Sequence, residues 1–105
     1  MNTLEKRLLG EDWNVRIALA RKGHKEYLDV LVHDVDSDVR CEVAGKGYKE
    51  HLDILVHDKD WHVRLEVAIH GHKKHLDILA NDEDYNVKRA VDRTVRYNKL
   101  NKITK

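Results

Sequence analysis

The sequence repeats itself every 24 residues. An aspartate, a valine three residues later and a basic residue directly after the valine recur in register: Asp12, Val15, Arg16; Asp36, Val39, Arg40; Asp60, Val63, Arg64; Asp84, Val87, Lys88. Longer segments agree as well, as in KGHKEYLDVLVHD (22–34), KGYKEHLDILVHD (46–58) and HGHKKHLDILAND (70–82). A fixed period of this kind is typical of a stacked repeat protein, in which each unit buries its apolar face against its neighbours. The repetition therefore predicts the architecture and leaves the function open.

The period divides the 105 residues into a single domain of about four units. Three full units are expected at 11–34, 35–58 and 59–82, with a half-repeat at 1–10 that caps the N-terminal end. Residues 83–105 are expected to form a degenerate repeat that caps the other end. Hydrophobic residues make up 41% and charged residues 37% of the chain, which suits an elongated stack with a thin core.

Residues 35–58 show how one unit is built. Asp36 stands where it can cap the first helix, on which the apolar stripe consists of Val39, Val43 and Ala44. A second short helix is expected within 48–57, with an apolar face formed by Leu52, Leu55 and Val56. This spacing fits an α-helix and a 3₁₀-helix equally well. Neither helix is long enough to persist alone in water, so stacking must stabilise both.

Three positions define how the units end and stack. The first helices are expected to end at left-handed C-caps, at Gly23, Gly47 and Gly71. Two apolar columns should run through the stack: Val15, Val39, Val63, Val87 and Leu28, Leu52, Leu76, Leu100. In the last unit, Asp92 and Val95 replace the small alanine and the glycine, and Asn101 and Lys102 make the final segment polar. A terminal capping repeat requires this kind of change.

A resemblance to known families rests on the string D-x-D-x-x-V-R-x-x-V-A, which runs from Asp34 to Ala44 and resembles the start of HEAT-type repeats. The 24-residue period and the L-D-x-L-V stretch are similar, over residues 11–100, to the leucine-rich repeat variant family. The resemblance implies an all-α fold, a short right-handed α-solenoid in which an α-helix alternates with a 3₁₀-helix. The chain departs from that family in having no proline. It also lacks the cysteine-rich segment that holds an iron–sulfur cluster in one member, so no cofactor is implied.

Charge is balanced overall but uneven along the chain. The formal net charge is +1, so no global field attracts nucleic acid or an anionic membrane. Residues 83–105 carry seven Lys/Arg against three Asp/Glu, a net +4, while residues 1–82 carry thirteen against sixteen, a net −3. No stretch approaches the roughly 18 apolar residues of a membrane span, and residues 1–10 lack a signal-peptide core. We therefore expect a cytoplasmic protein without membrane contact.

One basic residue per unit forms a column that could follow a nucleic-acid backbone: Arg16, Arg40, Arg64 and Lys88. Each lies four residues after an aspartate, and further carboxylates are supplied by Asp34, Asp58 and Asp82. Equal numbers of acids and bases favour an internal ladder of ion pairs. The basic C-terminal stretch offers further possible nucleic-acid contacts, namely Lys88, Arg89, Arg93, Arg96, Lys99 and Lys102.

Aromatic residues recur in the first turn of the first helices, outside the apolar stripe, as Trp13, Trp61 and Tyr85. Large aromatic side chains off the core are the usual anchors of a protein interface. Alternatively, each ring covers the turn before it, where the related family has proline. We take this column as the candidate surface for a protein partner, together with its neighbours Asn14, His62 and Asn86.

The remaining candidates for chemistry have structural explanations. His70, His72 and His75 read H-x-H-x-x-H, but two of these positions hold tyrosine in other units, which favours packing over metal binding. Cys41 takes the position of Ile17 and Leu65, as an apolar filler would. With one cysteine there is no disulfide framework. We expect no metal site, no cofactor and no catalytic site.

The sequence therefore predicts a non-catalytic protein–protein interaction module. Its size suits an adaptor or a stoichiometric inhibitor, for instance in phage–host conflict. The alternative is a HEAT-like nucleic-acid-binding protein that uses the basic column and the basic C-terminal stretch. A third interpretation is a repeat array, natural or designed, that binds nothing.

Overall fold

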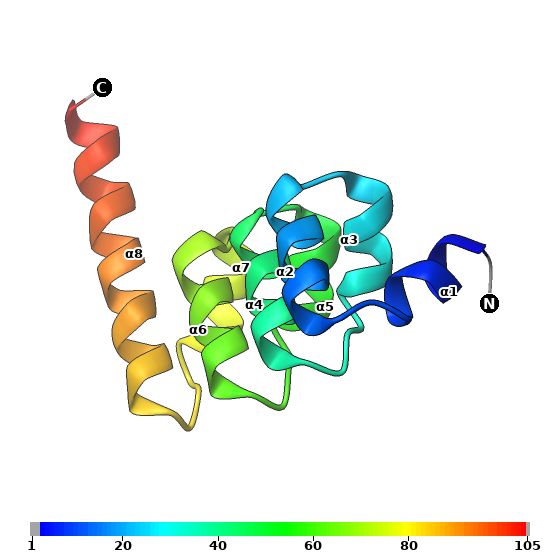
Figure 1. The fold of residues 1–105 in the computed structure, drawn as a ribbon. Coiled ribbons are helices and arrows are strands. Elements are labelled where there is room, and N and C mark those ends of the chain that lie inside the picture. The colour runs from blue at the N-terminus through cyan, green and yellow to red at the C-terminus, as the bar shows by residue number, and fades with distance from the viewer. Residues whose placement is uncertain (1–2, 105) are drawn as a thin grey trace.

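The computed structural model of the protein describes residues 3–104, and every regular element in this part of the chain is an α-helix (Figure 1). The helices are α1 (Thr3–Leu9), α2 (Trp13–Lys22), α3 (Lys25–Leu31), α4 (Ser37–Gly45), α5 (Lys49–Leu55), α6 (Trp61–His70), α7 (Lys73–Leu79) and α8 (Tyr85–Thr104). An all-α fold was expected from the pattern of apolar residues, and the structure confirms it.

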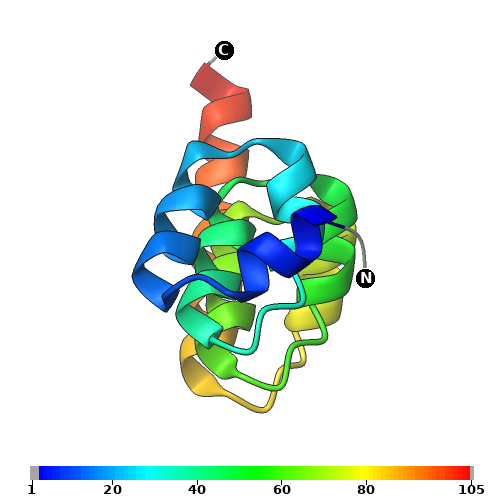
Figure 2. The same ribbon diagram turned by 45° about the vertical axis from the view of Figure 1, so that its right-hand side comes forward.

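The helices lie in two rows. The first row consists of α2, α4, α6 and α8, each packed against the next, and the second consists of α3, α5 and α7 (Figure 1). At the N-terminal end, α1 lies against α3 and covers the open side of that helix (Figure 2). The molecule measures 46 × 32 × 20 Å, so it is longer than it is thick and its core is thin.

The core follows the two predicted apolar columns except at one end of each. Val39, Val63 and Val87 are fully buried, as are Leu28 and Leu52. Val15 and Leu100 were expected in the same columns, but Val15 is exposed and Leu100 has 62% of its surface exposed. Val15 lies on the first helix of its row and Leu100 on the projecting part of the last. Each column is therefore exposed at one end only, since Leu28 and Val87 are fully buried.

The aspartates before the first helices cap three of the four as predicted. The Oδ1 atom of Asp36 accepts a hydrogen bond from the Asp38 N–H at 2.8 Å, and Asp60 and Asp84 accept equivalent bonds at the same distance from His62 and Asn86. Asp12 also precedes a first helix but makes no side-chain capping bond.

The glycines that end these helices do not all have the predicted conformation. Gly23 and Gly47 have a φ of +76°, in the left-handed region that favours glycine. Gly71 has a φ of −73°, so the expectation of a left-handed cap there is wrong. Glycine is needed at that position for space, because a Cβ atom would lie 2.5 Å from the carbonyl oxygen of Val67 and 3.0 Å from the Cβ of His75.

The second-row helices are α-helices, not the 3₁₀-helices that the family resemblance implied. Each has seven residues. Their backbones make i→i+4 hydrogen bonds, such as Leu28 N–H to His24 O at 3.1 Å and Leu52 N–H to Tyr48 O at 3.0 Å. Without proline the chain retains the backbone donors that an α-helical turn requires.

The last unit contains one helix where two were expected. From Tyr85 to Thr104, α8 is one continuous helix of 20 residues. Its C-terminal half projects beyond the other helices (Figure 1). Val95 occupies the position that glycine holds in the three preceding units, so no residue there readily adopts the left-handed conformation that reverses the chain.

Candidate functional site

The basic column of the first three units forms ion pairs inside the molecule. The guanidinium of Arg40 donates to both carboxylate oxygens of Asp58, at 2.8 and 3.1 Å, and its third nitrogen donates to the carbonyl oxygen of Asp34 at 2.7 Å. Arg64 repeats this arrangement with Asp82 and the Asp58 carbonyl. Each arginine therefore connects the two turns that flank its own unit.

The ladder explains why these cations cannot serve as a phosphate-binding column. Arg16 pairs with Asp34 in the same way, at 2.7 Å, and the side chains of these arginines are mostly buried. The Asp58 carboxylate raises the pKa of Arg40, and the Asp82 carboxylate raises that of Arg64, although burial opposes both changes. Lys88 is the exception, because it is exposed on α8.

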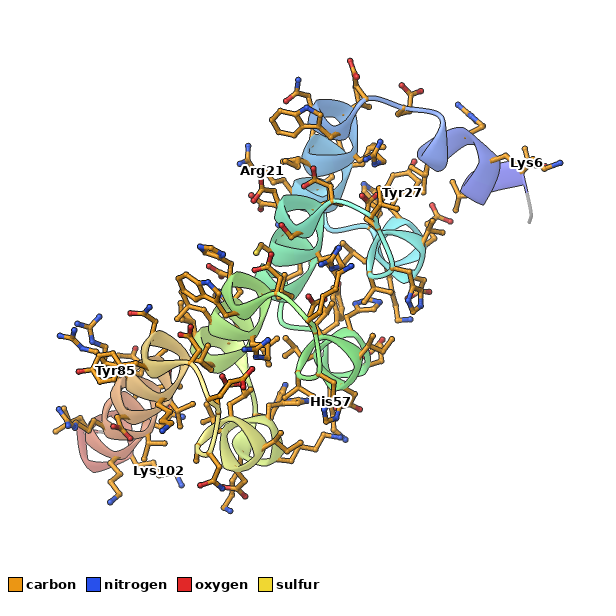
Figure 3. The ribbon with its side chains drawn as sticks, turned by 90° about the horizontal axis from the view of Figure 1, so that it is seen from below. Lys6, Arg21, Tyr27, His57, Tyr85 and Lys102 are labelled. Carbon is orange, nitrogen blue, oxygen red and sulfur yellow. The ribbon has the colours of Figure 1, made fainter. Side chains whose placement is uncertain are left out.

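The structure separates the predicted aromatic column into two regions. Trp13 begins α2, at one end of the first row, and is 49% exposed; Asn14 beside it is also exposed. Tyr85 begins α8, at the other end of that row, and is 70% exposed. It points outward from α8, away from the neighbouring helices (Figure 3). These aromatic residues cannot form one continuous patch, because α4 and α6 lie between α2 and α8.

Trp61 differs from the other two aromatic residues in being partly buried. It packs against the hydrophobic core, and its ring stacks on that of His62 with a centroid distance of 3.7 Å. His62 in turn lies 3.1 Å from the Asp60 carboxylate. One face of the indole is thus covered, so Trp61 contributes both to the core and to the surface beside it.

An open groove of about 770 Å³ lies between α6 and α8. We call it the α6–α8 groove; its lining residues are Trp61, Leu65, Ile69, His70, Asn86, Arg89, Ala90, Arg93, Thr94, Tyr97 and Asn98. The groove brings together two residues predicted to bind a protein and two predicted to bind nucleic acid: Trp61, Asn86, Arg89 and Arg93. It therefore joins two surfaces that the sequence presented as separate.

The cations of α8 are free of the ion pairs found elsewhere in the molecule. Among the described residues, no carboxylate lies within 4.0 Å of the charged groups of these side chains, which are Lys88, Arg89, Arg93, Arg96, Lys99 and Lys102. Asp92 is the one acidic residue of this helix. Lys99 and Lys102 line a second groove, of about 550 Å³, between α7 and the projecting half of α8. Along α8, positive charge thus faces solvent.

The central histidines of the second row are packing residues, as their interchange with tyrosine indicated. His51 and His75 are buried, and each places Nε2 2.7 Å from an aspartate of the preceding second-row helix, Asp29 and Asp53. The Nδ1 atom of His75 accepts the His72 N–H at 3.0 Å, so the neutral ring carries its proton on Nε2 and donates it to Asp53. Among the described residues, no three His, Cys, Asp or Glu side chains are placed to hold a metal ion.

Cys41 behaves as the apolar filler that its position suggested. It is partly buried against the core. Burial, reinforced by nearby carboxylates such as Glu66, raises the pKa of its thiol to about 12. The thiolate that would act as a nucleophile is therefore scarce at neutral pH.

One groove residue that the sequence analysis did not single out is Ile69. It is 48% exposed on α6. The equivalent positions hold Arg21, Gly45 and Arg93, so an exposed isoleucine here is a departure from the repeat. This departure from the repeat is the feature of the sequence from which Ile69 could have been identified as a surface residue.

Comparison with known proteins adds no assignment. No helix in residues 3–104 combines the length and the apolar character that crossing a bilayer requires. No family model matches the chain, and neither the curated proteins nor the solved structures include a significant match to it.

Proposed function

We propose that this protein is a non-catalytic protein–protein interaction module, acting as an adaptor or a stoichiometric inhibitor. The scaffold is a short right-handed α-solenoid of 24-residue units. The scaffold proposal is supported by the repeated arginine–aspartate contacts, each of which joins residues 18 positions apart. The α6–α8 groove carries the functional proposal, because exposed apolar side chains meet unpaired cations there.

Within this surface the residues have different roles. Trp61, Ile69 and Tyr97 supply apolar area, while Asn86 supplies a polar group at the edge of the groove. Tyr85 and His62 lie in the first turns of the same two helices, but neither lines the groove. Trp13 and Asn14, on α2, are too far along the row to belong to this contact. A partner large enough to span the first row would reach them as well.

The proposal is tested by replacing exposed apolar residues of the groove. Ile69→Ser combined with Tyr97→Ser should abolish capture of a stoichiometric protein partner from native lysate treated with nuclease. The matched control combines Ile78→Ser with Tyr48→Ser, since Ile78 is 47% exposed but lies in the second row. Helical circular dichroism should be unchanged in both variants. Equal capture by the two variants would rule out the groove as the contact surface.

Nucleic-acid binding is the second candidate, favoured by the six α8 cations without carboxylate partners. A protein that neutralises phosphates with these residues should lose affinity steeply as salt rises. Arg93→Glu combined with Lys99→Glu should then weaken binding to duplex DNA and reduce its dependence on salt. The absence of measurable DNA binding at low salt would exclude this candidate.

A further inference from the structure

We propose that the segment recognised by the α6–α8 groove is an acidic amphipathic helix of a partner protein. This inference rests on the protein-binding function proposed above. It adds the chemistry of the partner: carboxylates that pair with the cations of α8, and an apolar stripe that packs between α6 and α8.

The charge of the partner follows from the uneven pairing of cations. Arginines of the first three units are matched by carboxylates, as in the Arg16–Asp34, Arg40–Asp58 and Arg64–Asp82 pairs. On α8 six cations accompany one acid and no such pair forms among the described residues. Arg89 and Arg93 are one helical turn apart, so both guanidinium groups lie along the same wall of the groove. Carboxylates on a facing segment would meet two adjacent donors there.

The apolar part of the groove indicates a peptide in preference to a nucleobase. Leu65 and Ile69 are aliphatic, and they lie opposite Tyr97 and Ala90 of α8. Base recognition would use flat aromatic faces, but one face of Trp61 already stacks on His62 at 3.7 Å. Aliphatic walls suit leucine, isoleucine or valine side chains of a protein partner.

The dimensions of the groove fit a short helix. Its lining residues on α8 run from Asn86 to Asn98, which corresponds to about 18 Å at the rise of an α-helix. On α6 they run from Trp61 to His70, or about 14 Å. A helix of about three turns therefore matches the groove, with apolar residues spaced three and four apart. The groove between the two helices is open to solvent, so nothing in the described structure blocks the approach.

The test is selection from a phage-displayed library of random 16-residue peptides against the full chain. Enriched peptides should carry a net negative charge and apolar residues at i, i+3 or i+4. As synthetic peptides they should bind about tenfold more weakly to the Arg89→Glu/Arg93→Glu variant. They should also bind more weakly to the Ile69→Ser/Tyr97→Ser variant. The matched control is Lys49→Glu/Lys59→Glu, which makes the same charge change at exposed positions away from the groove and should leave binding unchanged.

The outcomes separate this inference from the function on which it rests. Peptides that need Ile69 and Tyr97 but show no acidic excess would overturn the inference and leave the protein-binding function standing. Peptides that bind all the variants equally would overturn both. Enrichment of no groove-dependent peptide also overturns the inference. If in that case a duplex DNA binds and depends on Arg89 and Arg93, the nucleic-acid function replaces it.

Discussion

Arg40 and Asp58 lie 18 residues apart in the sequence, and two hydrogen bonds of 2.8 and 3.1 Å join their side chains. The third nitrogen of the guanidinium donates to the carbonyl oxygen of Asp34, the last residue of the preceding unit. Asp58 in turn accepts the N–H of Asp60, which caps the next first-row helix. One arginine thus holds together the two turns between which its unit lies.

Removing this arginine should destabilise the fold. Arg40→Met keeps much of the side-chain volume but removes the guanidinium that donates to the Asp58 carboxylate and to the Asp34 carbonyl. Both side chains of the pair are 8% exposed, so we expect a loss of about 3 kcal/mol in the free energy of unfolding, measured by urea denaturation. The control is Arg21→Met, because Arg21 is largely exposed in its pair with Glu42, and that pair should contribute less than about 1 kcal/mol. Similar losses in the two variants would contradict the structural role of the ladder.

Substituting the helix-ending glycines should show whether each is required because a side chain would clash or because its backbone is left-handed. Gly71→Ala places a Cβ atom 2.5 Å from a backbone carbonyl, which must move to accommodate it. Gly47→Ala meets no atom within 4 Å, so its cost is that of a left-handed alanine, about 1 kcal/mol. We expect Gly71→Ala to be the more destabilising by thermal and urea unfolding. The reverse order would show that the backbone near Val67 adapts without cost.

Restoring glycine in the last unit tests why α8 continues. Val95→Gly should cost about 1 kcal/mol of helix stability relative to Val95→Ala and should interrupt α8 near that residue. Backbone NMR chemical shifts would report loss of helix in 95–104 while 85–94 stays helical. Val95→Ala removes both methyl groups of the valine without adding backbone freedom, and it should keep the helix whole. If Val95→Gly leaves residues 95–104 as helical as Val95→Ala does, the absence of glycine is not the reason for the long helix.

Acid should weaken the contact between α5 and α7. Hydrogen bonds from Lys74 and from His75 lower the pKa of Asp53 from 3.8 to about 2. Because the folded-state pKa is the lower one, this carboxylate stabilises the fold fully above its ordinary pKa, and the contribution disappears as the pH falls towards about 2. The stability difference between wild type and Asp53→Asn, from urea midpoints, should therefore shrink between about pH 5 and pH 2. Asp77→Asn is the control, since the charged partner of Asp77 among the described residues is Lys73 of its own helix. A difference that stays constant with pH would contradict the assignment.

Much of the fold could be predicted because it depends on short-range chemistry. The caps at Asp36, Asp60 and Asp84 use an aspartate and a backbone N–H two residues later, so the sequence contains both partners. The buried columns follow from the period. The errors fall at the ends of the columns and at one crowded glycine. Val15 lies on the first helix of the first row and Leu100 on the projecting part of the last, and both are exposed. Gly71 lies so close to Val67 and His75 that a Cβ atom would clash with them.

The candidate site was harder to predict, because it depends on which helices are adjacent. Trp61 and Asn86 were identified from their shared position in the repeat, and Arg89 and Arg93 from their charge. Their meeting in one groove follows from the packing of α6 on α8. The periodicity alone gave no reason to separate Trp13 from Tyr85, since equivalent positions look alike whatever their distance along the row.

The arginine–aspartate contacts have a consequence for how such a chain can change in length. The arginine–aspartate contact is completed within one unit and the turn before it, so an inserted copy of 24 residues brings its own bonds with it. Duplicating the unit that contains α6 would insert a helix pair ahead of the terminal helix and leave the final pair of first-row helices unchanged. The proposed recognition surface would then stay at the end of a longer array, so the length of the array and the chemistry of its binding surface can change independently.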